Sequence, residues 1–526
     1  MSEIHDQSAS AAVAIADVAV APPPSLGRLL FSGSSALGLA TLLERGFGFV
    51  ANLAAARLGG AHTFGAYSIA MTAANNVASY AGAGIGTTAN RFSGEYPYGS
   101  RGYKGLLRTL ALVSLASAAL AIGILWFAAA PLAVHLIRNP ALTSLLRLAA
   151  ISSGAIILLE CLRGLLIGQR RFTALLTLSA LFGGGLAIVL PLAAVYGASG
   201  MVASQFAIAM SAILICILAA RKLGFTPPPS SALAIQGPRA SAIVRFGAVQ
   251  LAGMIGLNAA GWWVASLVAR ADISLVQAGW YSVAMQLRNI CAMPASLVSQ
   301  TAYAQLTENG GQRYGGASRV TVISTIAATS ISLLVAGPAA ALMPWIIPGL
   351  YGKDFAGAEF AGTLAVATGL IHMSAAPAAA RLTVVSLPAT GMINGVWSLL
   401  MVGLGTWLVP SGGAAQAAGC FLASHLFAAI AVLVVLLRSR SASRELIFVT
   451  LPALVGSMLI AVLGWLRAVG PHKAAFSTGI LLATAGLLWI GIHRSRQTSA
   501  ALRELTFSKF TSDLLARRGF AFSRSR

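Results

Sequence analysis

The feature that most constrains this chain is a series of long apolar stretches separated by short glycine-rich or basic segments. A membrane-spanning helix needs about 20 residues, and these stretches are continuous rather than alternating, which argues against a transmembrane barrel. Only 9% of residues are charged and the mean hydropathy is +0.81, whereas soluble chains carry roughly a quarter charged residues. The sequence therefore predicts an all-α polytopic membrane protein. Fourteen spans are expected, near residues 29–56, 64–89, 106–136, 141–166, 173–196, 199–220, 243–269, 276–303, 320–348, 357–380, 384–409, 413–437, 447–467 and 474–493.

The distribution of basic residues predicts the orientation. The net charge is +22, from 35 Lys and Arg against 13 Asp and Glu. With the N-terminus inside, 26 basic residues fall in cytoplasmic segments and 6 in outer ones, with three more inside spans. Lys and Arg are enriched on the cytoplasmic side of membrane proteins. We therefore expect a multi-pass membrane protein with both termini cytoplasmic.

An internal repeat divides the predicted spans into two groups. Residues 65–71 (GAYSIAM) resemble residues 279–285 (GWYSVAM) at an offset of 214, and the same offset aligns 50–53 with 264–267. A unit of six spans crosses the membrane an even number of times, so both copies have the same orientation. Transporters whose halves are related by an axis along the membrane normal have this arrangement. The expected organisation is two parallel six-helix repeats plus two C-terminal helices. The predicted parts are a tail (1–28), an N-lobe (29–222), a linker (223–242), a C-lobe (243–438), spans 13 and 14 (439–493) and a basic tail (494–526).

Several classes of site are disfavoured by the sequence. The four cysteines lie in apolar segments without paired spacing, so they predict neither a disulfide framework nor a metal site. The tail from Arg494 is basic with interleaved phenylalanines. It is expected either to dock on anionic lipid or simply to set orientation, and not to bind nucleic acid, because it is tethered to a membrane. We expect no cofactor, no metal and no catalytic residue.

Three short segments resemble a known family. They are residues 56–68 (ARLGGAHTFGAYS) with the glycine-rich stretch 82–92, residues 350–358 (LYGKDFAGA), and the region around 412–415 (GGAA). Together the sequence over residues 29–440 resembles the polysaccharide-transport, or Wzx-type flippase, branch of the multidrug/oligosaccharidyl-lipid/polysaccharide exporter superfamily. The resemblance implies a two-lobe fold and export of an undecaprenyl-diphosphate-linked oligosaccharide across a bacterial inner membrane, for exopolysaccharide or O-antigen synthesis. Alternating access is expected from the two repeats, by rocking of one lobe against the other. Fourteen spans are also found in MurJ-type lipid II flippases, although no detailed motif of that branch is present.

Polar residues inside spans are the candidate substrate-binding groups, because a charge at mid-bilayer is costly. Arginine suits a diphosphate, so Arg288 is the first candidate and Arg45 the second. Glu44 suits sugar hydroxyls or a coupling proton. The remaining candidates are the amides Asn258, Asn289 and Asn75. The partners implied are the lipid-linked oligosaccharide, membrane lipids and a coupling ion, H⁺ or Na⁺.

Structural roles compete with these assignments. Glu44 and Arg288 could instead form an ion pair that latches the two lobes. Glu160 and Arg163, three residues apart, are expected to pair on one helix face. His372 and His425 fit packing better than a proton relay.

Two other functions stay open at this stage. A cation-coupled multidrug exporter of the same superfamily would favour acidic residues in its cavity, whereas these spans hold more arginine than glutamate. A membrane-embedded glycan enzyme would need loops that carry carboxylates, and the loops here are short.

Overall fold

The protein is described by a computed structural model that places residues 26–82, 84–96, 101–219, 240–308, 316–439, 441 and 444–498. Most of the predicted linker, most of both predicted tails and a short segment after residue 308 lie outside these described residues. Within them every regular element is helical. The elements are α2 (Leu26–Ala81), α3 (Ile85–Glu95), α4 (Arg101–Pro131), η1 (Leu132–Leu136), α5 (Leu142–Gly168), α6 (Phe172–Ala193), η2 (Ala194–Tyr196), α7 (Gly197–Leu218), α8 (Ala240–Ala271), α9 (Val276–Glu308), α10 (Gly316–Tyr351), η3 (Lys353–Ala358), α11 (Glu359–Val385), α12 (Leu387–Arg438), α13 (Glu445–Val469) and α14 (Lys473–Thr498).

Eight of the described helical stretches are long and apolar enough to cross a membrane. Large apolar side chains cover the outside of the bundle, including Phe127, Trp407 and Trp489, which are 81%, 76% and 67% exposed. Such a surface suits lipid, in which a helix satisfies its own backbone hydrogen bonds. The all-helical membrane class predicted from the sequence is therefore confirmed, whereas the count of fourteen spans stays a prediction.

Two of the helices each contain a sharp break at a glycine. Gly60 in α2 has φ 75° and Gly413 in α12 has φ 62°, so each long helix consists of two helices joined at that residue. Positive φ is readily adopted only by glycine. Short α3, which the sequence analysis did not predict, follows α2 after Gly84, which also has positive φ.

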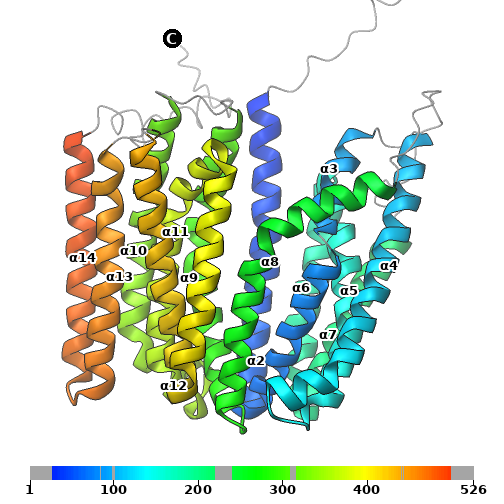
Figure 1. Cartoon of the computed structure of the whole chain (residues 1–526), viewed down its shortest axis with the longest axis horizontal. Coiled ribbons are helices and arrows are strands. Elements are labelled where there is room, and N and C mark those ends of the chain that lie inside the picture. Colours follow the sequence, from blue (N-terminus) through cyan, green and yellow to red (C-terminus); the bar gives the residue numbers. More distant parts are fainter. Residues whose placement is uncertain are drawn as a thin grey trace, which may run out of the picture.

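The helices form two groups that converge at one end (Figure 1). Helices α2 to α7 pack together in one group, and α9 to α14 pack together in the other. Helix α8 packs on α12, and its first turns reach α3, where Phe246 packs against Phe92. We call the end that carries Leu26 and Thr498 the terminal face and the opposite end the far face.

Glycines bring the two groups into close contact at the far face. A methyl group on Gly65 of α2 would lie 2.0 Å from the carbonyl oxygen of Leu275, and one on Gly279 of α9 would lie 2.3 Å from that of Ala61. The offset of 214 relates Gly65 to Gly279 and Ala61 to Leu275. Each group thus presents its glycine to the backbone of the other, and we call this contact the glycine crossing.

Further contacts between the groups surround the glycine crossing. Phe64 packs edge-on against Phe355, with ring centroids 6.3 Å apart. The Arg57 guanidinium donates hydrogen bonds to the carbonyls of Gly349 and Leu350 at 2.6 and 3.0 Å. A ring nitrogen of His62 is within hydrogen-bond distance of a carbonyl in the α8–α9 connection. The far face is therefore the end at which the two groups are joined.

Candidate functional site

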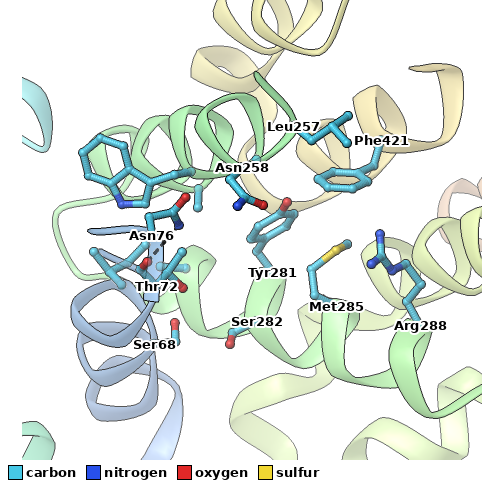
Figure 2. A pocket seen from close by; sticks show the side chains of 15 residues that line it. Ser68, Thr72, Asn76, Leu257, Asn258, Tyr281, Ser282, Met285, Arg288 and Phe421 are labelled. Carbon is cyan, nitrogen blue, oxygen red and sulfur yellow. Dashed lines mark hydrogen bonds between the residues drawn. The ribbon is translucent and has the colours of Figure 1, made fainter. Parts of the chain in front are cut away.

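A polar cavity lies between the two helix groups. It has a volume of about 300 Å³, and α2, α8 and α9 supply most of its lining. Figure 2 shows Ser68, Thr72 and Asn76 of α2 facing Tyr281 and Ser282 of α9. The remaining lining residues are Ile69, Leu257, Asn258, Gly261, Trp262, Ala265, Ala278, Met285, Arg288 and Phe421. We call this space the central cavity.

Two further cavities adjoin the central cavity. One, of about 480 Å³, shares Leu257, Asn258, Arg288 and Phe421 with it and is otherwise lined by α11 and α12, including His372 and His425. We call it the histidine cavity. The other, of about 260 Å³, is lined by α2, α3 and α5 and includes Glu160. Asn258 lines all three cavities. This side chain therefore stands at the junction of a polar space shared by both helix groups.

Arg288 carries the positive charge of this space. Its Nε and Nη2 donate to the Asn289 side-chain oxygen at 3.3 and 3.1 Å, and its Cζ lies 5.1 Å from the Phe421 ring centroid. No carboxylate lies within ion-pair distance of Arg288 in the part of the chain that the structure describes. A half-buried guanidinium without a counter-charge favours an anionic ligand.

Helix packing fixes the level of Arg288 in the bundle. Helix α11 passes α9 at Gly369, where an added methyl group would lie 3.3 Å from the Arg288 Cγ and 3.3 Å from its backbone oxygen. The absence of a side chain at Gly369 lets the two helices approach closely. This approach leaves the guanidinium on the cavity side, as Figure 2 shows.

Glu44 lies in a separate ionic cluster. Its Oε1 is 2.6 Å from Nη2 of Arg163 on α5, and Nη1 of the same arginine is 2.5 Å from Oε1 of Glu160. The predicted pairing of Glu160 with Arg163 is confirmed. The alternative pairing of Glu44 with Arg288 is wrong, because Glu44 pairs with Arg163 within the N-terminal group.

The substrate-binding residues predicted from the sequence therefore lie only partly around the central cavity. Arg288 and Asn258 line the central cavity, and Asn289 hydrogen-bonds Arg288. Arg45 and Asn75 are exposed and are not among the residues that line the three cavities. Asn76, next to Asn75, lines the central cavity instead.

Several lining residues were missed by the sequence analysis. Ser68, Tyr281 and Ser282 belong to the repeated segments 65–71 and 279–285. Ser68 and Ser282 are related by the offset of 214, so a comparison of polar positions within the repeat would have found them. No sequence signal marks Phe421. The described part of the chain contains no cluster of three or more His, Cys, Asp or Glu side chains that could hold a metal ion.

The arrangement resembles that of known membrane transporters. A lipid II flippase, MurJ, in an inward closed conformation matches with a TM-score of 0.59 and 15% identity over 93% of this chain and 100% of that one. An inward-facing multidrug resistance MATE transporter of the MOP superfamily matches with a TM-score of 0.53 and 13% identity, over 77% and 97% of the two chains. A MOP superfamily transporter from Pyrococcus furiosus gives a TM-score of 0.54 and 14% identity, over 78% and 94%. The fold is therefore that of MOP superfamily transporters.

A family model gives the more specific assignment. The model described as "Polysaccharide biosynthesis protein" matches residues 30–303, which is more than half of the chain. No curated protein sequence matches the chain. The chain belongs to the polysaccharide biosynthesis protein family, and the resemblance drawn from its sequence is confirmed.

Proposed function

We propose that the protein is a flippase that moves an undecaprenyl-diphosphate-linked oligosaccharide across the bacterial inner membrane. The observation that carries the proposal is Arg288, a cation without a carboxylate partner among the described residues, at the junction of two connected cavities. A diphosphate offers planar sets of oxygens that a guanidinium binds with two parallel hydrogen bonds. The serine, threonine and asparagine side chains of the central cavity supply donors and acceptors for sugar hydroxyls.

Transport by alternating access is part of this proposal. The two groups would be the two six-span repeats, with α8 as the first span of the second repeat and α13 and α14 as an addition to it. The reciprocal contacts of Gly65 and Gly279 support a two-fold relation between the groups. The glycine crossing would keep the cavities closed toward the far face, and its separation would open them there. With both termini cytoplasmic, the far face would be the outer one.

A cation-coupled multidrug exporter is the second candidate, because MATE transporters share the fold. Such an exporter would use an acidic group to hold a cationic drug. The central and histidine cavities are lined by no Asp or Glu residue within the described chain. Glu44, the acidic candidate from the sequence, is paired with Arg163. The charge of the cavity therefore favours an anionic substrate.

Depletion of the protein from its host tests the proposal. We expect a polyprenyl-diphosphate-linked oligosaccharide to accumulate in the lipid extract and to stay on the inner leaflet, inaccessible to an external glycan-modifying enzyme. Wild-type protein and Arg147→Ala should clear it, since Arg147 packs on Trp126 and is not among the residues that line the three cavities. Arg288→Ala should not. Retention of dyes or drugs without lipid accumulation would instead support the multidrug exporter.

A further inference from the structure

Two histidines meet in the histidine cavity beside Arg288. His372 of α11 and His425 of α12 have ring centroids 4.9 Å apart, although 53 positions separate them in the sequence. Both line the cavity that also contains the Arg288 guanidinium. His372 is exposed to this cavity and His425 is half-buried. Three side chains that can carry positive charge therefore share one space in the bundle.

The surroundings of His425 fix which ring nitrogen can accept a proton. Its Nδ1 lies 2.8 Å from the backbone oxygen of Phe421, one helical turn earlier, so Nδ1–H donates to that carbonyl. The indole N–H of Trp397 points at the same Nδ1 from 3.4 Å, which would require Nδ1 to accept a proton. The contact with the carbonyl is shorter by 0.6 Å and therefore favours the tautomer that carries the proton on Nδ1. Phe421 stacks on the His425 ring at 18°. Nε2 is therefore left with the lone pair of a neutral imidazole.

The charged and titratable groups near the pair are mostly cationic or neutral. They are Arg288, Tyr281 and Cys291 on α9, Cys420 on α12 and Arg381, nine residues after His372 on α11. No carboxylate is among the described residues that line the histidine cavity. A proton on either imidazole thus adds positive charge next to another imidazole and a guanidinium. An anion bound at Arg288 would remove this electrostatic penalty.

We propose that His372 and His425 form a proton-binding pair coupled to the anionic ligand at Arg288. When a diphosphate binds, one imidazole takes a proton from the water of the cavity and becomes an imidazolium. When the diphosphate leaves, the proton returns to that water. This inference rests on the proposed function and adds to it that one H⁺ binds together with the anionic ligand, at histidine rather than at the carboxylate Glu44.

Linkage gives the expected size of the effect. If binding of the anion takes up one whole proton, the affinity falls about tenfold for each unit by which the pH rises above the titration of the pair. If only a packing role exists, the imidazoles stay neutral and the affinity follows the titration of the ligand alone. The pH dependence of binding, rather than the affinity at one pH, therefore distinguishes the two roles.

Farnesyl diphosphate binding to the purified full-length protein in detergent tests the pair. Affinity and proton uptake in weak buffer are measured between about pH 5.5 and 8.5 for wild type and for the double variant His372→Gln, His425→Gln. Because the probe itself titrates in this range, the quantity compared is the difference between the two proteins. His135→Gln, at an exposed position on η1, serves as the control.

We expect the double variant to bind the probe with the extra proton uptake abolished and a flatter pH dependence, while His135→Gln behaves as wild type. Each single variant should keep part of the uptake, which also covers the case in which the double variant folds poorly. Uptake in the folded double variant that equals that of wild type would overturn the proton pair but leave the flippase intact. If the double variant does not fold, single variants whose uptake matches wild type at every pH would overturn the pair, because loss of one imidazole should shift the titration of the other. Failure of wild type to bind the probe at any pH would overturn both.

Discussion

Replacing Gly65 by alanine should open the far face of the protein. The new methyl carbon would lie 2.0 Å from the carbonyl oxygen of Leu275, whereas such a carbon–oxygen contact normally rests at about 3.3 Å. Helices α2 and α9 would have to separate by about 1.3 Å at this point, because the obstacle is backbone and cannot rotate away. Overpacking of this kind costs about 1–3 kcal/mol. The same reasoning applies to Gly279→Ala against Ala61.

A cysteine in the cavity reports the opening. In a background without the four native cysteines, Ser68→Cys would be labelled by a membrane-impermeant maleimide added at the far face. We expect slow labelling with Gly65 present and several-fold faster labelling with Gly65→Ala. Gly48→Ala, on the same helix with open space around it, should change nothing. The double variant Gly65→Ala, Gly279→Ala should cost less stability than the sum of the single variants, because one separation relieves both contacts. Unchanged labelling and thermal stability in Gly65→Ala would refute a tight seal at the glycine crossing.

Three further predictions concern stability and are read from thermal unfolding in detergent. Burial alone would raise the pKa of Asp272 in the α8–α9 connection, but hydrogen bonds from the backbone N–H of Gln277 and from Ser274 lower it. The stabilisation that the ionised Asp272 provides, about 1 kcal/mol as for a helix cap, should be complete above the unfolded pKa near 3.9 and disappear as the pH falls through the lower folded value. An Asp272→Asn difference that does not shrink as the pH falls below the unfolded pKa would contradict this. Arg163→Ala should destabilise the protein more than Glu44→Gln does, since only the loss of Arg163 leaves two carboxylates without a counter-charge. Equal losses of stability would contradict this role of Arg163. Arg467→Ala should lower the unfolding free energy by about 3 kcal/mol. The reason is that this buried guanidinium donates hydrogen bonds to α10, α11 and α14. A change of less than about 0.5 kcal/mol would disprove that Arg467 holds these helices together.

The class of fold follows from the sequence because hydrophobic length and charge distribution are local properties. The pairing of Glu160 with Arg163 was predictable for the same reason, since one helical turn separates them. The pairing of Glu44 with Arg163 was not, because it depends on how α2 packs against α5. Periodicity also could not show that Asn76, rather than its neighbour, turns toward the cavity.

The charged centre of the site was predictable and its aromatic surroundings were not. Arg288 is conspicuous because an arginine in the middle of an apolar span is rare. The sequence marks His372 and His425 as polar residues inside spans, but their contact arises from the packing of α11 against α12 and could not be predicted from it. Arg467, at the end of the predicted span 447–467, lies in the last turn of α13, where hydrogen bonds to three neighbouring helices satisfy its guanidinium. The sequence could not show these partners, because they belong to other helices.

Flipping by the purified protein in proteoliposomes tests whether the protein moves a lipid-linked oligosaccharide and needs Arg288 to do so. The substrate is a fluorescent polyprenyl-diphosphate-linked oligosaccharide placed in one leaflet, and its arrival in the other is followed by quenching. We expect wild type and Arg147→Ala to move it, Arg288→Lys to be slower, and Arg288→Ala to lose about ten- to a hundredfold, the equivalent of 1.5–3 kcal/mol for a charge-assisted hydrogen bond. Equal flipping by wild type and Arg288→Ala would contradict the role of Arg288 in binding the diphosphate.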